Sequence, residues 1–514
     1  MFRAVAAAAL CATSVAAMAQ TQLQVQPQPQ APAASAAAPD MRAAKIAALE
    51  PQLTAQFQAW MKANNVPGLV YGVVTAQGPV LVRGVGVQDV ATSQPVGAQS
   101  RFRIASMSKA FTALAIMKLR DEGKLSLDAP AETYVPEMKG WRYPTSDSRR
   151  IRVSDLLHHT AGFVEDNPWG DRQQPLAEAD FTKLLAAGMD FAQPPGIRME
   201  YSNLGYALLG RIVTNVSGMP YQDYIARDIM LPLGMRDTNY DVFAGDPARR
   251  ALGYRWQDDA WVREPDMADG TFGAMGGVIT TAADYAQWVR LLLSAWPARD
   301  GAESGPVRRA TVREIVEGAN FVRTAERTTD GVTCRFPTAY AKGWNVIQDC
   351  ALGRIVTHSG GYPGYGSLLM LLPDAGVGVF AFANRTYAGP RQPVEAALNE
   401  LRKAGLAEDR TIPVSPQLAE AYATMKAIWR SGDPARAPLA VNVALDRDLE
   451  RRRQDIAALK AKVGTCDTEA PISPVSTAEG YFRWTCKTGN VAGRVQRAPT
   501  PGKELQVIDF RAAE

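Results

Sequence analysis

A serine and a lysine three residues apart, Ser106 and Lys109, stand at the start of a long apolar segment. On a helix, residues at i and i+3 are neighbours on one turn, so the hydroxyl and the amine would lie together. A serine hydroxyl becomes a good nucleophile when a nearby base takes its proton, and a lysine desolvated against apolar side chains, with its pKa lowered, is such a base. The free N–H groups at a helix N-terminus also suit a developing oxyanion. The pair therefore predicts nucleophilic catalysis by Ser106.

The elements around this pair predict a sheet packed against helices. The helix is expected to begin near Ser106 and to end at Gly123, and it is apolar nearly all round, as buried helices are. Residues 41–64 have helical spacing of apolar side chains, and 68–74 and 79–84 are strand-like. A helix, a hairpin and a buried helix indicate layers that share one core.

The middle and later parts of the chain add further elements. One helix is predicted from Leu204 to about Val216, and another is predicted after a cap at Thr280 or Thr281. A third group of segments reads as an antiparallel meander followed by a helix, with strands at 354–361, 366–372 and 377–384 and the helix at 394–403.

Adjacent histidines, His158 and His159, lie in a segment predicted to be a helix that ends at Gly162. Neighbours on a helix point in different directions, so we interpret both as structural residues rather than as a catalytic pair. The chain has only three histidines, the third being His358, and no Cys-x-x-Cys pair. We therefore expect no metal site and no cofactor.

The N-terminus has the pattern of a cleavable export signal at residues 1–19, with Arg3, an Ala-rich run and the box Ala17-Met18-Ala19. The run is too short for a stable membrane span. Residues 20–40, rich in Gln, Pro and Ala, are expected to form a disordered linker. A net charge of +4 with scattered Lys and Arg does not favour nucleic acid. We expect a periplasmic or secreted protein.

Four cysteines follow the predicted signal. Their even number in an oxidising compartment suggests two disulfides. Of three connectivities, we favour Cys334–Cys350 and Cys466–Cys486 because those partners are close in sequence. After about residue 405 the composition changes, and two helical stretches (416–430 and 446–463) lead to short strands near Cys486.

Three motifs occur in a recognisable order: Ser106-x-x-Lys109, then Tyr201-x-Asn203, then His358-Ser359-Gly360. They resemble the motif set of the serine β-lactamase and penicillin-binding-protein superfamily. Further segments resemble its class C-like branch, which includes D-alanyl-D-alanine carboxypeptidases, D-aminopeptidases and esterases; they are Leu156-Leu157-His158-His159-Thr160-Ala161-Gly162, Pro232-Leu233-Gly234-Met235 and Gly276-Gly277-Val278. The resemblance covers roughly residues 45–400.

The resemblance implies an α+β fold: an antiparallel sheet flanked by helices, with an all-helical subdomain and the site between them. The implied domain would span 41–404, and 405–514 would be a small α+β C-terminal appendage. The resemblance makes Ser106 the acylated nucleophile, Lys109 its proton partner and Tyr201 the general acid/base.

The resemblance also implies residues that bind substrate. Asn203 would position substrate or Lys109, and His358, Ser359 and Gly360 would border the substrate. The backbone N–H groups of Ser106 and Gly361 would form the oxyanion hole.

The third motif departs from the lactam-handling relatives, which have Lys-Thr-Gly or Lys-Ser-Gly where this chain has His358. A histidine with an unperturbed pKa near 6.5 would be only about a quarter charged at pH 7. A Lys487-Thr488-Gly489 occurs near the C-terminus but lacks a long apolar strand before it, so we interpret it as a turn. Glu264-Pro265-Asp266-Met267 resembles the deacylating glutamate segment of class A enzymes. Because it follows the Tyr-x-Asn motif, which is not the family order, we do not assign it that role.

The leading hypothesis is a secreted serine hydrolase of the esterase or D-amino-acid peptidase type, weak on β-lactams, acting on a small-molecule or peptide substrate. A true class C-like β-lactamase and a D-alanyl-D-alanine carboxypeptidase stay open, because fold does not fix substrate. A non-catalytic cell-wall peptide-binding protein is the alternative from another class. Ser106, Lys109 and Tyr201 are all present, which favours an enzyme. The sequence leaves the oligomeric state open.

We predict that the mature protein begins at Gln20 and has no free thiol, because cleavage after Ala19 would remove Cys11. N-terminal sequencing and thiol titration of native protein check both statements. Two or more titratable thiols would contradict the disulfide assignment.

Overall fold

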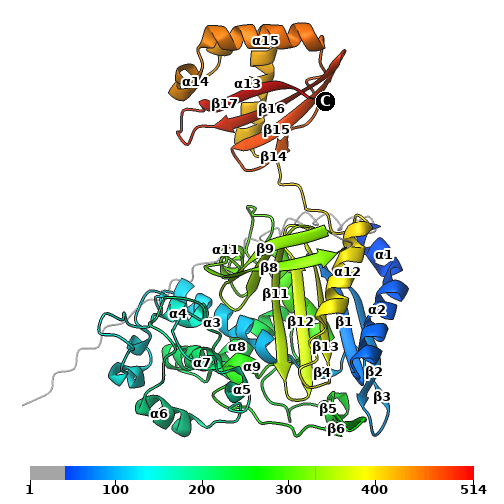
Figure 1. Cartoon of the computed structure of the whole chain (residues 1–514), viewed down its shortest axis with the longest axis vertical. Coiled ribbons are helices and arrows are strands. Elements are labelled where there is room, and N and C mark those ends of the chain that lie inside the picture. Colours follow the sequence, from blue (N-terminus) through cyan, green and yellow to red (C-terminus); the bar gives the residue numbers. More distant parts are fainter. Residues whose placement is uncertain (1–40, 330–331, 514) are drawn as a thin grey trace, which may run out of the picture. The chain divides into compact units, whose positions relative to one another are not determined.

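The computed structural model describes residues 41–329 and 332–513. The predicted signal (1–19) and linker (20–40) lie outside the described residues. A nine-stranded antiparallel sheet, in the order β3-β2-β1-β13-β12-β11-β10-β9-β8, forms the centre of the larger part of the chain (Figure 1). Its strands are β1 Gly68–Thr75, β2 Gly78–Asp89, β3 Gln94–Pro95, β8 Asn320–Thr329, β9 Val332–Tyr340, β10 Asn345–Asp349, β11 Gly353–Tyr362, β12 Tyr365–Leu372 and β13 Val377–Ala383.

The central strands β1, β12 and β13 are buried along their whole length because both faces of the sheet are covered. Successive side chains of a strand point to opposite faces, so each strand feeds two cores. Tyr71 belongs to one core, with α1 Met41–Ala48, α2 Glu50–Ala63 and α12 Arg391–Lys403. Val70 belongs to the other core, which includes the central helices given below.

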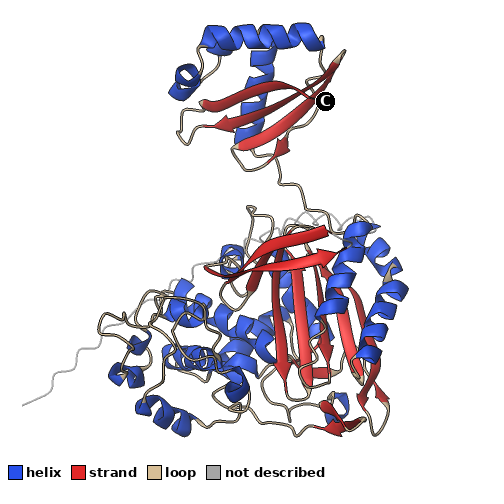
Figure 2. Cartoon of the chain, viewed as in Figure 1, coloured by secondary structure: helices blue, strands red, loops and turns tan. Residues whose placement is uncertain are grey.

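The second core extends into a helical region beside the sheet (Figure 2). Its helices are α3 Lys109–Asp121, α4 Val153–Leu157, α5 Asn167–Gly170, α6 Glu178–Ala187, α7 Asn203–Ser217, α8 Tyr221–Ile225, α9 Gly273–Gly276, α10 Ala282–Ser294 and α11 Arg309–Ile315. Two small strand pairs lie outside the main sheet: β4 Arg101–Arg103 with β7 Ile279–Thr281, and β5 Tyr254–Gln257 with β6 Ala260–Arg263. The predicted α+β class and antiparallel sheet are confirmed.

Two predicted helices differ from the structure. The helix predicted to start near Ser106 begins as a 3₁₀ turn, η1 Ala105–Ser108, and becomes α-helical only at Lys109. The helix predicted to reach Gly162 ends at Leu157, and His159 has a left-handed backbone (φ 58°). Left-handed geometry ends a helix, and histidine is one of the few residues other than glycine that adopt it with some frequency.

The C-terminal elements have a sheet and a core of their own. The four-stranded sheet runs β14-β15-β16-β17, and Trp484 is fully buried in its core. The elements are α13 Pro416–Ser431, α14 Val441–Asp446, α15 Leu449–Val463, β14 Ser473–Pro474, β15 Glu479–Cys486, β16 Gly489–Arg497 and β17 Leu505–Ala513. Lys487 and Thr488 form the turn between β15 and β16, as predicted.

Both predicted disulfides, Cys334–Cys350 and Cys466–Cys486, are confirmed. The first joins β9 to the residue just after β10, and the second joins the segment after α15 to the end of β15. Each disulfide joins segments that are also neighbours in the fold, and each closes a short loop because its cysteines are only 16 and 20 residues apart.

Candidate active site

The backbone in front of Ser106 is fixed from two sides. The carbonyl of Ile104 accepts a hydrogen bond from Ser367 Oγ at 2.8 Å, and the N–H of Ile104 donates to Val278 O at 3.0 Å. Between Ile104 and Ser106, Ala105 has a left-handed backbone (φ 49°). Residues other than glycine rarely adopt this geometry, and it clusters at functional sites. Ser106 is thus presented on a turn that its neighbours hold in place.

Lys109 is fully buried, and its three contacts define the site. Its Nζ donates to Asn203 Oδ1 at 2.7 Å, to Met275 O at 2.9 Å and to Ser106 Oγ at 3.2 Å. Burial lowers the pKa of Lys109 to about 7, and the negative charges of Asp171 and Asp166 oppose this shift. The amine is therefore poised to exchange a proton near neutral pH.

Tyr201 lies just before α7, where it meets both members of the first motif. Lys109 Nζ is 4.9 Å from the centre of its ring. Burial raises the pKa of Tyr201 well above its ordinary value, and the nearby Ser106 side chain opposes that shift. Asn203, on the first turn of α7, is fully buried and contacts Lys109. The structure thus brings together Ser106, Lys109, Tyr201 and Asn203.

Two aspartates that the sequence analysis did not single out support this cluster. Asp166 accepts hydrogen bonds from the N–H groups of Asn203 (2.6 Å) and Leu204 (2.8 Å), so it caps α7 from a distant segment. Asp171 is buried, and its burial raises the pKa of its carboxyl. No motif marks either residue, because their partners lie far away in the sequence.

The two adjacent histidines have different surroundings, and one of them contacts the site. The ring of His159 lies 4.4 Å from that of Tyr201, and its Nδ1 accepts the N–H of Ser202 at 3.1 Å. Burial lowers the pKa of His159 well below its ordinary value. Burial also lowers the pKa of His158, to about 4. Both rings are neutral at pH 7, and His159 supports the segment that carries Tyr201.

His358, on β11, is 3% exposed, and both of its ring nitrogens are engaged. Nδ1 donates to Ser359 O at 2.7 Å, and Nε2 accepts from Tyr340 OH at 3.1 Å. Burial lowers the pKa of His358 to about 3. The sequence analysis expected about a quarter of this ring to be charged at pH 7, whereas the buried ring is neutral. The difference arises because desolvation disfavours the charged form.

The glycines after His358 let β11 approach the nucleophile. A Cβ on Gly360 would lie 2.2 Å from Ile104 O and 3.0 Å from Ala105 Cβ, so only glycine fits there. Ser359, by contrast, is exposed. Gly361 follows on the same strand, paired with Gly366 of β12. The backbone of β11 therefore lies directly against the turn that presents Ser106.

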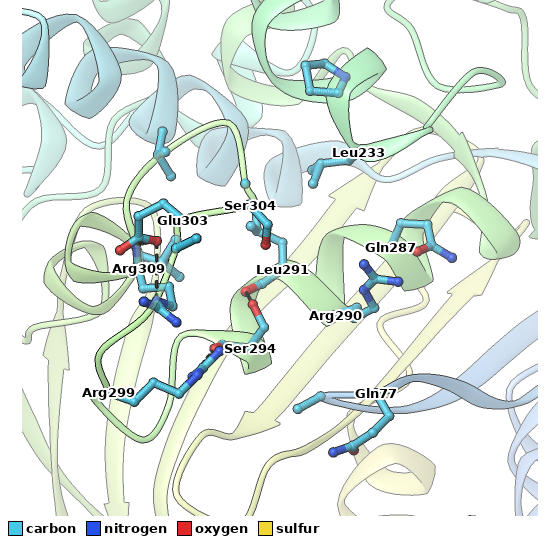
Figure 3. Close-up of a pocket in the computed structure, with 16 residues that line it drawn as sticks. Gln77, Leu233, Gln287, Arg290, Leu291, Ser294, Arg299, Glu303, Ser304 and Arg309 are labelled. Carbon is cyan, nitrogen blue, oxygen red and sulfur yellow. Dashed lines mark hydrogen bonds and ion pairs between the residues drawn. The ribbon is translucent and has the colours of Figure 1, made fainter. Parts of the chain in front are cut away.

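Other features of the described residues fall outside this cluster. They contain no group of three or more His, Cys, Asp and Glu side chains suited to a metal ion. Within the same residues, no helix has the length and apolar character needed to cross a membrane. Figure 3 shows a polar pocket of about 470 Å³ beside α10, lined in part by Gln287, Arg290 and Arg299; none of the residues that line it belongs to the three motifs.

Comparison with known proteins agrees with this arrangement. A family model described as Beta-lactamase matches residues 53–403. Protein flp of Staphylococcus aureus (strain N315) is 26% identical over 326 residues, and this chain spans 61% of its length and aligns over 63% of its own. The D-alanyl-D-alanine-carboxypeptidase/endopeptidase AmpH of Escherichia coli (strain K12) is 28% identical over 308 residues, which are 58% of this chain and 74% of AmpH.

Two solved structures share the fold. The octameric penicillin-binding protein homologue from Pyrococcus abyssi covers 87% of this chain and 96% of its own, with a TM-score of 0.58 and 20% identity. A class C β-lactamase from Rhodobacter sphaeroides covers 68% of this chain and 99% of its own, with a TM-score of 0.53 and 23% identity. The family match over residues 53–403, which is more than half of the chain's length, shows that the chain belongs to the β-lactamase family.

Proposed function

We propose that this protein is an exported serine hydrolase that cleaves esters or amides through an acyl-enzyme on Ser106 and is weak on β-lactams. One observation carries the proposal. Ser106 Oγ accepts a hydrogen bond from a buried lysine with a lowered pKa, and that lysine lies against the Tyr201 ring, while the third motif supplies a neutral His358 in place of a cation. The exported location rests on residues 1–19 and on the two disulfides.

In the proposed acylation step, Ser106 Oγ bonds to the substrate carbonyl carbon and passes its proton to neutral Lys109 or through Tyr201. The N–H groups of Ser106 and Gly361 would hold the resulting oxyanion. When the tetrahedral intermediate collapses, the bond to the leaving group breaks and Tyr201 returns the proton to that group. Water then attacks the acyl-enzyme, and the same groups move its proton back to Ser106.

The charges around Ser106 favour neutral substrates. His358 contributes no positive charge, and Asp166 and Asp171 are carboxyl groups that act on Lys109. A substrate carboxylate would therefore lack the fixed cation that lactam-handling relatives have at this position. A D-alanyl-D-alanine carboxypeptidase remains the second candidate, because AmpH, which is 28% identical, carries that name. A binding protein without catalysis is less well supported, because Lys109 contacts both Ser106 and the ring of Tyr201.

We further propose that residues 41–404 form the hydrolase domain and that 405–514 form a separate appendage. The C-terminal elements contribute to a core that contains no side chain from residues before Leu418.

Replacing the nucleophile should remove covalent labelling. We expect a fluorophosphonate to add one equivalent to wild type, measured by intact mass, and none to Ser106→Ala. Lys109→Ala and Tyr201→Phe should each lower turnover of a p-nitrophenyl ester by about 10²-fold or more, the usual scale for a lost acid or base. Labelling of another serine in Ser106→Ala would show that the nucleophile is misassigned.

The reaction should depend on the protonation of Lys109. We expect kcat/KM for a neutral ester to rise with pH through about 7, because only the neutral amine accepts the serine proton. In Asp171→Asn, the loss of a negative charge that raises the pKa of Lys109 should move the midpoint to lower pH. Asp374→Asn, in the turn between β12 and β13, serves as a control and should leave the midpoint unchanged. A rate that is flat between pH 6 and 8 would contradict this role.

A lysine at position 358 should favour the hydrolysis of β-lactams over that of esters. We expect wild type to prefer short p-nitrophenyl esters or D-alanine p-nitroanilide over nitrocefin. In His358→Lys the ratio of nitrocefin to ester kcat/KM should rise about 10-fold relative to the neutral control His358→Gln, the scale of one charged hydrogen bond. Wild-type turnover of nitrocefin at the rate of a dedicated lactamase, or no difference between the two variants, would contradict the argument.

A further inference from the structure

Tyr387, in the loop between β13 and α12, combines exposure with an unusual backbone. Its side chain is 51% exposed, although it is a large aromatic residue. Its φ is 54°, in the left-handed region that residues without a short polar side chain rarely occupy. Its N–H donates to Tyr362 O (3.3 Å) and Tyr365 O (3.1 Å), at the turn between β11 and β12. The surrounding backbone therefore holds Tyr387 in a strained position with its ring accessible.

On the sheet side, the ring lies against the strand that approaches the nucleophile. A Cβ on Gly361 would be 2.9 Å from Tyr387 Cδ1, so the ring covers that face of Gly361. The preceding residue, Gly360, packs against Ala105, which is bonded to Ser106. Two neighbouring residues of β11 thus contact, respectively, the Tyr387 ring and the residue before Ser106.

On the side of the helical region, the Tyr387 hydroxyl contacts Asp171, whose charge acts on Lys109. Tyr387 OH donates to Asp171 Oδ2 at 3.0 Å, and Asp171 is 3% exposed. The neighbouring Gly170 packs against Asn203, since a Cβ there would be 2.6 Å from Asn203 Cβ. Tyr387 therefore bridges the two sides of the catalytic cluster, from β11 to the segment that holds Asn203.

Resting on the proposed function, we propose that Tyr387 is a specificity-determining residue whose ring forms a wall beside Gly361 and limits the bulk of the substrate group next to it. Strained residues persist where the surroundings hold them, and they cluster at ligand sites. The ring of Tyr387 is accessible, and the hydrogen bonds of its backbone N–H and the bond of its hydroxyl to Asp171 hold it in place. It can therefore act as a rigid surface that selects substrates by size, because the ring excludes bulky substrate groups from the space beside Gly361.

The test compares kcat/KM along two series of p-nitrophenyl or aryl esters. One series lengthens the acyl group from acetyl to decanoyl, and the other enlarges the alcohol at constant acetyl. Tyr387→Gly and Tyr387→Asn both tolerate the left-handed backbone and remove the ring. In one of the two series they should raise the preference for the bulkiest over the smallest member about 10-fold, the scale of a changed apolar contact in a pocket.

Two controls separate the ring from other effects. Tyr387→Phe keeps the ring and the backbone hydrogen bonds to Tyr362 and Tyr365, so its preference for bulky over small members should stay within about 2-fold of wild type, even if loss of the bond to Asp171 changes its overall rate. Tyr481→Ala, at another exposed tyrosine (42%) on β15, should also change neither series. Unchanged selectivity in Tyr387→Gly and Tyr387→Asn, or an equal change in Tyr387→Phe, would overturn the proposal. Fluorophosphonate labelling of each variant is measured in parallel; absence of labelling in wild type would refute the proposed function instead.

Discussion

The burial of one amine, that of Lys109, is the constraint on which the site depends. A lysine away from water is costly unless its hydrogens are bonded, and here Ser106, Asn203 and Met275 accept all three. Each acceptor comes from a different element: η1, α7 and α9. The requirement to satisfy one amine thus joins three segments that are far apart in the sequence, and burial of that amine lowers its pKa into the range that the proposed chemistry needs.

Much of this could be predicted from the chain, because the signals were local. The meander of β11 to β13 follows from apolar runs separated by turn residues, and Ser106 with Lys109 follows from one spacing. The resemblance of three motifs placed Tyr201 and Asn203 beside them. The disulfide pairs could be predicted because the partners are close in sequence, and this rule works when a disulfide closes a small loop.

The rest depended on contacts between distant segments. Asp166 caps a helix that begins at Asn203, and no spacing rule connects a cap to a helix so far along the chain. His159 was predicted on a helix, but α4 ends earlier, and its left-handed backbone turns the ring toward Tyr201. The charge of His358 also depended on burial, since the same imidazole on a surface would titrate near neutrality.

The pairing of β1 with β13 has a consequence for how the chain acquires its structure. These two strands lie side by side at the centre of the sheet, yet one comes from the beginning of the described chain and the other follows Leu372. The sheet can close only after β13 has been synthesised, and such non-local pairing is slow to form. A growing polypeptide therefore exposes the apolar faces of β1 and β2 to water until the later segments that cover them have been synthesised.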